Sequence, residues 1–383
     1  MKLCLLKFQV GLVILLSVVA ANVVAGTDEL PAGKIFPQVF SDQSPWNMQI
    51  SESPSIDPMS QNMIANLRWL LEYSDINPSI GIAYDKWTSP IHIVDFDSAR
   101  KVNVFNRTYS WFSGRAPFFH TVDPDGDGVA KNIPIPAGLW ADSEEDGHMI
   151  IVDINKKQAY EFSKFSYSWG SYKASRVDFW DLTERGVREV SGLNLGENYW
   201  MSGVRGAGSP FIAGIVRYDE MQAGVINHAL SFAGLSTRKG NDSSGLEREF
   251  CGYSSLTEGQ VGVASRSDGL WGVDGPVEDG LVSARNDQWI EGASIMEGQR
   301  IMLKQDINVE AMPVSEHAKI ILRALQTYGG YMVDNANGFQ MYFENLGDET
   351  WKWSAFSGVL DISSLALEDL DILTCENIVY FDE

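Results

Sequence analysis

The hydrophobic pattern between residues 79 and 310 predicts a succession of short β-strands. Apolar runs with period-two alternation, or with continuous apolar character, are separated by clusters of Gly, Asp, Asn, Ser and Pro. In one of these runs, Ile150 and Val152 fall on the same face as His148, and Met149 and Ile151 fall on the other. The predicted strands cover residues 91–95, 102–105, 147–154, 158–165, 173–182, 211–218, 224–232 and 300–303.

Two segments have helical periodicity instead. Residues 58–73 begin with Pro58, which suits the start of a helix, and carry an apolar stripe at helical spacing. Near the C-terminus, Ser315 suits an N-cap and Gly329 ends a second apolar stripe. Both segments are short compared with the strand-rich region, so we expect two short peripheral helices.

The elements together predict a mainly β fold, with a single large β-sandwich or jelly-roll-like domain over residues 58–383. The 35 glycines suit long loops between sheets. Residues 330–333 and 339–343 flank an Asn-Ala-Asn-Gly turn and predict a hairpin after the second helix. Residues 26–57 are rich in Pro, Ser and Asp with little periodicity, and they predict an extended N-terminal arm on this domain.

The first 25 residues have the pattern of a secretory signal peptide. Lys2 and Lys7 precede an apolar run at 11–20, and Val23-Val24-Ala25 offers small residues for cleavage. No later stretch reaches the ~18 apolar residues of a transmembrane helix. We therefore expect a secreted protein, extracellular or periplasmic, that begins near Gly26 and does not insert into a membrane.

The charge narrows the range of partners. The chain has 51 acidic and 29 basic residues, a formal net charge of −22. Such a charge repels nucleic acid and anionic membranes, so neither partner is expected. We expect a monomer whose partner is a polysaccharide or an oligosaccharide.

Two cysteines remain after the signal peptide, Cys251 and Cys375. An oxidising compartment allows one disulfide between them, which would close a long loop near the C-terminus. The alternative is two buried free thiols.

An acidic loop is the sharpest local motif. Asp123, Asp125 and Asp127 alternate with Pro and Gly, which can wrap oxygen ligands around a calcium ion. Pro134 stands where an EF-hand needs its last glutamate, so this is not an EF-hand. The alternatives are a stabilising Ca²⁺ loop, the only cofactor we expect, and a plain acidic turn.

Two acidic clusters at predicted strand edges carry the candidate catalytic residues. Glycoside hydrolysis needs a pair of carboxylates, one to protonate the leaving oxygen and one to act as nucleophile or base. Asp146 and Glu220 are the best pair, with His148 and His228 as groups that tune them or act as general bases. The alternative for Glu220 and His228 is a structural hydrogen bond across a hairpin.

Other residues suit substrate binding. Arg205, in a Gly-rich turn, can hold a carboxylate bidentately, although such an arginine more often anchors a loop. Tyr218 and Arg205 would serve a lyase that neutralises a uronate and removes its C5 proton. Trp180 belongs to a set of tryptophans that could stack on sugar faces, although most Trp residues are core. The set is Trp46, Trp111, Trp140, Trp169, Trp180, Trp271 and Trp289.

Three segments resemble a family of secreted, β-rich bacterial proteins of poorly defined function that are met in polysaccharide-degrading bacteria. They are residues 133–153, with Ile-Pro-Ile-Pro-Ala-Gly and Asp-Gly-His-Met-Ile-Ile-Val-Asp, residues 220–230, and residues 321–334. The resemblance implies an extracellular β-rich protein. It directs attention to the polar residues in these segments, namely Asp146, His148, Glu220, His228 and Asp334, the last as a substrate-binding residue.

These observations predict a secreted polysaccharide-degrading enzyme, a glycoside hydrolase that uses a carboxylate pair. The alternatives are a polysaccharide lyase on the same architecture and a non-catalytic glycan-binding protein. The chain has no Gly-x-Ser-x-Gly elbow, dinucleotide fingerprint, Walker loop or His-Glu-x-x-His motif.

Overall fold

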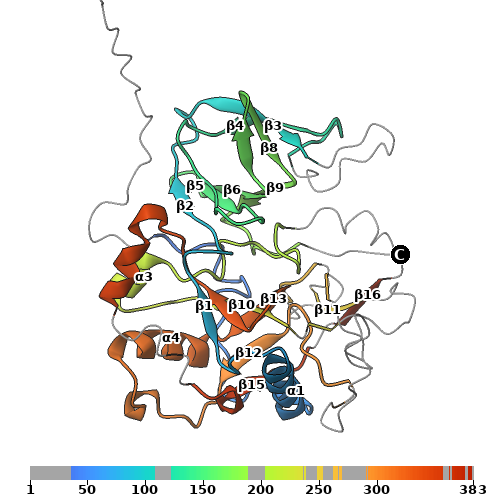
Figure 1. Cartoon of the computed structure of the whole chain (residues 1–383), viewed down its shortest axis with the longest axis vertical. Coiled ribbons are helices and arrows are strands. Elements are labelled where there is room, and N and C mark those ends of the chain that lie inside the picture. The colour runs from blue at the N-terminus through green and yellow to red at the C-terminus, as the bar shows by residue number, and fades with distance from the viewer. Residues whose placement is uncertain are drawn as a thin grey trace, which may run out of the picture.

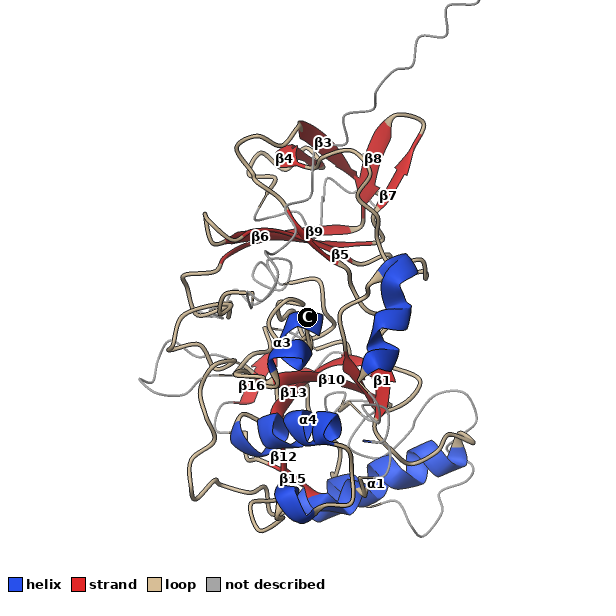
Figure 2. Ribbon diagram, turned by 90° about the vertical axis from the view of Figure 1, so that its left-hand side faces the viewer, coloured by secondary structure: helices blue, strands red, loops and turns tan. Residues whose placement is uncertain are grey.

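The computed structural model of the 383-residue chain shows stacked β-layers with helices on one outer face (Figure 1, Figure 2). It describes residues 36–107, 122–188, 203–235, 237–238, 248–252, 262–265, 267–269, 290, 292–356, 362, 365–375 and 378–381. The predicted signal peptide, 1–25, and the first part of the predicted arm lie outside these ranges. Strand exceeds helix, which confirms the mainly β class.

The outer two layers form a sandwich from residues 91–181. One sheet has the order β2 (Ile91–Ile93), β5 (Met149–Asp153), β6 (Gln158–Ser163) and β9 (Arg176–Asp181). The outermost sheet has the order β4 (Val129–Pro134), β3 (Lys101–Asn106), β8 (Ser171–Ala174) and β7 (Ser166–Ser168). An apolar core that includes Val104, Met149, Ile151 and Phe162 fills the space between them.

The third layer is a six-stranded mixed sheet at the centre of the molecule (Figure 2). Helices α1 (Ser60–Tyr73) and α4 (Glu316–Thr327) pack on one of its faces through a core that includes Leu67, Phe232 and Ile321. The order of its strands is β1 (Gly81–Ala83), β14 (Gln340–Tyr342), β10 (Leu230–Gly234), β13 (Gly330–Asn335), β12 (Arg300–Leu303) and β15 (Leu370–Ile372).

A second core joins the central sheet to the sandwich. It contains Ile150 and Val152 from β5 together with Ala233, Val333 and Tyr342 from the central sheet. The sheet formed by β2, β5, β6 and β9, called the β5 sheet below, is therefore covered on both faces. This explains why all five residues of β5 are buried. The predicted division of this strand into two faces is confirmed, because Met149 and Ile151 lie in the other core.

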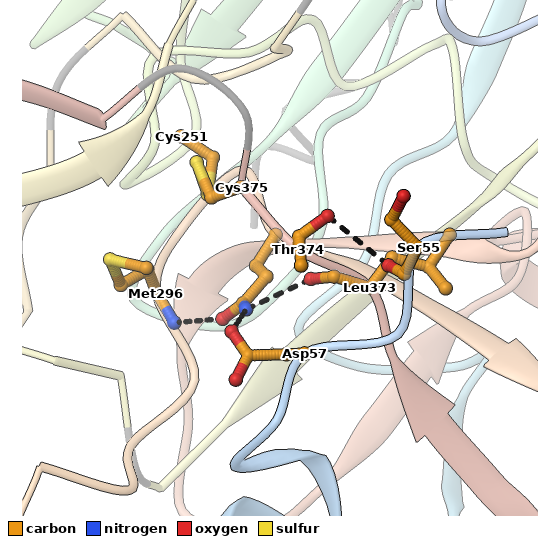
Figure 3. Close-up of a disulfide and its surroundings, with 8 residues drawn as sticks. Ser55, Asp57, Cys251, Met296, Leu373, Thr374 and Cys375 are labelled. Carbon is orange, nitrogen blue, oxygen red and sulfur yellow. Dashed lines mark hydrogen bonds between the residues drawn. A yellow bond between two sulfur atoms is a disulfide. The ribbon is translucent and has the colours of Figure 1, made fainter.

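The expected arm and the C-terminal segment meet around the disulfide. Cys251 and Cys375 are bridged, with their Cα atoms 5.5 Å apart, so the chain does not carry two free thiols here (Figure 3). The Thr374 hydroxyl donates to the Ser55 carbonyl at 3.1 Å. The Gln299 amide donates to the Leu373 carbonyl at 3.0 Å. The bridge thus ties the C-terminal segment to β11 (Arg248–Cys251), which pairs with β16 (Ile378–Phe381).

The remaining elements correct several predictions. Residues 211–217 are buried but irregular, and they lead into helix α3 (Tyr218–Ala223) rather than forming a strand. Of the predicted strand 224–232, only the end belongs to β10. β13 and β14 do not form a hairpin, because β10 lies between them and pairs with both. The 3-10 turns are η3 (Val309–Ala311), η4 (Gly347–Ala355) and η6 (Leu367–Asp369).

The helices are correctly located but are not peripheral. α1 matches the prediction for 58–73, and the Ser315 hydroxyl accepts a hydrogen bond from the Ala318 amide as an N-cap should. Both helices cover the central sheet and contribute to its core. The jelly-roll topology is not confirmed, since three sheets stack and several strand pairs are parallel. Within the described part of the chain, every helix is too short or too polar to cross a bilayer.

Candidate functional site

A pocket of about 500 Å³ opens between the β5 sheet and the central sheet. It is lined from both layers, and most of its lining is polar or aromatic. Its size is within the range of small-ligand sites, which runs from about 300 to 1,000 Å³. The lining residues are Trp87, Asp146, His148, Arg205, Gly234, Leu235, Asp334, Asn335, Ala336, Asn337, Gln340 and Tyr342.

The β5 sheet supplies Asp146 and His148. Residues at i, i+2 and i+4 lie on one face of a strand, so His148 shares the inner face of Ile150 and Val152. That face looks toward the central sheet. Asp146 precedes His148 by two residues and lines the same pocket. Two residues singled out from the sequence are therefore brought together.

The central sheet supplies Asp334 through an irregularity in β13. Along the parallel β10–β13 pair, Phe232 lies opposite Met332, but Ala233 lies opposite Asp334, so Val333 is an extra residue. A bulge of this kind re-aims the side chains that follow it. Without it, alternation would place Asp334 on the same face as Met332, toward the helices. With it, Asp334 shares the face of Ala233 and lines the pocket.

Arg205 reaches the pocket from a tight turn. The Ala207 amide donates to the Val333 carbonyl at 2.8 Å, which anchors this turn beside the end of β13. The Arg205 guanidinium lies against the rings of Phe211 and Tyr342, at 3.2 and 3.5 Å from their centroids. Its Nη1 is 3.9 Å from a carboxylate oxygen of Asp334. Arg205 is thus a buried cation beside an acidic group.

Two further carboxyl groups stand behind Asp334. The Oδ1 atoms of Asp268 and Asp334 lie 2.4 and 2.6 Å from the position that a Cβ on Gly206 would occupy. Glu297 is fully buried and accepts a hydrogen bond from the Asp268 amide at 3.1 Å. The Asn335 amide donates to Asp268 Oδ1 at 2.7 Å. Only a glycine at 206 leaves room for this arrangement.

This crowding of acidic groups controls the protonation of Asp334. Burial, and next the charge of Asp268, raise the pKa of Asp334 to about 7. Burial, and next Asp268, also raise the pKa of Glu297 well above its usual value. Burial raises the pKa of Asp146 as well, although Lys164 and Arg205 oppose this. The pocket therefore holds a carboxyl group that is still partly protonated near neutral pH.

The histidine and the tyrosine of the pocket are uncharged. Burial, followed by the charge of Arg205, lowers the pKa of His148 to about 3. One ring nitrogen, Nδ1, is 3.3 Å from the Phe162 carbonyl, which requires the neutral imidazole to donate from that nitrogen. Burial raises the pKa of Tyr342, so it remains a phenol. Both groups can exchange hydrogen bonds with a ligand.

Glu220 and His228 do not line this pocket. Glu220 is buried and accepts from the Arg217 backbone amide at 3.0 Å, and its Oε1 is 3.0 Å from His228 Nε2. Burial raises the pKa of Glu220, but Arg217 and His228 outweigh burial and lower it. The expected pairing of Asp146 with Glu220 is therefore wrong. The alternative hydrogen bond between Glu220 and His228 is present, at the start of α3 rather than across a hairpin.

Two of the expected substrate-binding residues are structural. Tyr218 begins α3 and packs its ring against Trp353 and Phe356, outside the pocket lining. Trp180 is 2% exposed and donates a hydrogen bond to Glu161 at 3.2 Å in the core between the sheets. The buried Trp180 ring cannot stack on a sugar, and the half-buried Tyr218 ring does not line the pocket. Arg205 and Asp334 do line the pocket.

The other tryptophans of the candidate set divide by exposure. Trp46 is fully buried, whereas Trp140 is 39% exposed and Trp169 is fully exposed. Trp111, Trp271 and Trp289 lie outside the described residues.

The aspartate loop does come together. One oxygen each of Asp123, Asp125 and Asp127 lies within 4.8 Å of the others. However, the Lys131 ammonium contacts Asp125 at 2.6 Å and Asp127 at 2.7 Å. A calcium ion would have to displace the Lys131 ammonium group, so the expected calcium site remains a prediction.

Sequence reasoning missed two residues that line the pocket, Gln340 and Tyr342, and the two acids that stand behind Asp334. Tyr342 and Gln340 lie on a short strand that was expected to form a hairpin, and Asp268 lies in an expected loop. Glu297 lies three residues before the predicted strand at 300–303. No local motif marks these positions, because their proximity to Asp334 arises from the strand order of the central sheet and from the segments packed at its edge.

No family model, curated protein or solved structure matches this chain.

Proposed function

We propose that this protein is a secreted glycoside hydrolase in which Asp334 is the general acid and Asp146 is the second carboxylate. One observation carries the proposal. Asp334, whose pKa burial and Asp268 raise to about 7, lines the same pocket as Asp146, His148 and Arg205. Glycoside hydrolysis uses a protonated carboxyl group to donate to the leaving oxygen and a second carboxylate as base or nucleophile.

Four other pocket residues have roles in this proposal. Arg205 lies 3.9 Å from Asp334 and would stabilise its carboxylate once the proton has been transferred. The neutral His148 and the amide of Gln340 would hold sugar hydroxyl groups. Trp87, at 45% exposure, offers an aromatic face to a sugar ring at the pocket.

A polysaccharide lyase is the second candidate. Arg205, His148 and Tyr342 line one pocket, and a lyase needs a cation for the uronate carboxylate together with a base for the C5 proton. The pKa values of the pocket residues favour a lyase less than a glycoside hydrolase. His148 has a pKa near 3 and burial raises the pKa of Tyr342, so both are poor bases near neutral pH. Asp146, and the ionised fraction of Asp334, would also repel an anionic sugar.

The test is a digestion panel. The mature protein meets neutral and uronate-containing polysaccharides with and without calcium, and reducing ends and the ultraviolet absorbance of unsaturated uronates are both recorded. We expect new reducing ends without absorbance. A rise in both signals would establish the lyase instead, and silence in both would favour the glycan-binding alternative.

The variants Asp334→Asn and Asp146→Asn assign the roles. Loss of a general acid costs about 10²- to 10⁴-fold in rate, so we expect at least a hundredfold loss for Asp334→Asn. Asp97→Asn is the matched control, because Asp97 is 79% exposed and only pairs with Lys156 at the surface. Turnover by Asp334→Asn at the wild-type rate would refute the assignment.

A further inference from the structure

The outermost sheet carries a tryptophan, Trp169, at a turn position whose backbone conformation disfavours large side chains. β7 and β8 are joined by a two-residue turn, because Ser168 pairs with Ser171. The turn residues are Trp169 and Gly170, with φ of +52° and +77°. Such a turn prefers Asn-Gly or Asp-Gly, since a bulky residue with positive φ is strained. The side chain of Trp169 is nevertheless fully exposed to solvent.

A second exposed ring lies on the same hairpin. Tyr167 lies on β7 at 58% exposure, and its ring centroid is 4.5 Å from that of Tyr172 on the paired strand. Tyr172 is nearly buried in the core of the sandwich, so it holds Tyr167 in place. The result is a pair of exposed rings on a rigid hairpin. Neither folding nor the pocket accounts for them, because the hairpin belongs to the outermost layer (Figure 2).

We propose that Trp169 and Tyr167 form a glycan-stacking platform, a binding site for neutral polysaccharide separate from the pocket. A sugar ring combines an apolar face with hydroxyl groups at its edge. The platform combines aromatic faces with the flanking hydroxyl residues Ser166, Ser168 and Ser171. The platform would hold a polymer on the protein while the pocket acts on it, and in this respect it rests on the proposed function.

The size and charge of the platform disfavour other occupants. A fully exposed Trp and a partly exposed Tyr offer at most roughly 400 Å² of contact surface, given about 150–250 Å² for each aromatic side chain. A stable protein interface needs about 800 Å² on each partner. An anionic membrane or an anionic polysaccharide would be repelled by the net charge of −22. A neutral glycan meets none of these objections.

The experiment is native electrophoresis in gels that contain mixed-linkage β-glucan, xyloglucan, galactomannan or, as the anionic comparison, alginate. The full mature chain is compared with Trp169→Asn, with Trp169→Tyr and with the control Trp351→Asn, which removes another exposed tryptophan (68% exposed). We expect at least one neutral gel to retard the wild type. In that gel, Trp169→Asn should bind at least fivefold more weakly, whereas Trp169→Tyr should keep most of the affinity and Trp351→Asn all of it.

Loss of binding by Trp169→Asn cannot be explained by misfolding, because Asn-Gly suits this turn better than Trp-Gly. We expect its unfolding midpoint to equal or exceed that of the wild type. Equal retardation of Trp169→Asn and wild type, retardation in alginate alone, or no retardation in any neutral gel would each overturn the proposal. Hydrolysis of short oligosaccharides should be unchanged in Trp169→Asn. Retardation through Trp169 without any hydrolysis would refute the proposed function and leave the platform standing.

Discussion

Asp334 should weaken the fold at alkaline pH, and its replacement by asparagine should therefore stabilise the protein there. In the folded chain, burial and the neighbouring Asp268 raise its pKa from 3.8 to about 7. Between these two pH values the folded protein keeps the Asp334 proton, whereas the unfolded chain has lost it. Because the folded state then binds more protons, its stability falls as the pH rises through this window.

The size of the effect follows from the same values. Moving a pKa from 3.8 to about 7 corresponds to about 4 kcal/mol between the two protonation states. The Asp334 side chain is 22% exposed, and solvent screening therefore lowers the free-energy cost of ionising it. We therefore expect Asp334→Asn to raise the free energy of unfolding by about 2 to 4 kcal/mol at pH 8. At pH 4, where Asp334 is protonated, the amide should change stability by less than about 1 kcal/mol.

The assay is urea unfolding of wild type and Asp334→Asn at pH 4 and pH 8. Other buried acids, such as Glu161 and Glu344, titrate in both proteins, so their effects cancel in the difference. Asp153→Asn is the control, because Asp153 accepts hydrogen bonds from the amides of Phe96, Asn155 and Lys156 and its loss should destabilise at both pH values. A difference between wild type and Asp334→Asn that is equal at both pH values would refute the reasoning.

Three further predictions concern the stability and the activity of single-residue variants. Cys251→Ser opens a disulfide that spans 124 residues, so we expect a loss of about 5 kcal/mol in urea unfolding, matched by reduced wild type. Gly206→Ala places a methyl group against Asp268 and Asp334, and we expect about a hundredfold loss of hydrolysis; wild-type turnover would contradict the packing. Lys131→Met removes the ammonium group that pairs with Asp125 and Asp127, so added calcium should raise its melting temperature more than that of the wild type; equal shifts would contradict a competition between Lys131 and calcium.

The strand and helix patterns succeeded where one periodicity dominates a segment. β5 is a nearly continuous apolar run, and its residues divide between two buried faces, as such a run predicts. α4 has a hydroxyl N-cap and an apolar stripe, and it lies where these signals put it. Periodicity failed for 211–217. The segment is apolar up to Val216, but the amides of Phe211 and Ile212 donate to the Glu161 side chain at 2.9 Å instead of to a neighbouring strand.

Part of the candidate site could be predicted from the sequence, because some of its polar residues stand in segments with clear local patterns. Asp146, His148 and Asp334 stand in the segments that the sequence singled out, and the pocket contains all three. Glu220 looked equally suitable, because a carboxylate beside a histidine has the same sequence pattern in a catalytic site and in a helix cap. The difference lies in Arg217, whose guanidinium pairs with Glu220 and keeps it ionised in the interior.

The mainly β class, the two principal helices, the cysteine pair available for a disulfide and most of the acidic residues of interest can be predicted from the sequence, because they depend on local periodicity and composition. Which carboxylates meet depends on how the sheets are built and stacked. The extra residue in β13 turns Asp334 toward the β5 sheet, and the stacking of that sheet on the central one brings Asp146 to the same pocket. Such contacts depend on strand register and on the order of the layers. A one-residue shift in register moves a side chain to the opposite face of the sheet, and no local sequence pattern encodes it.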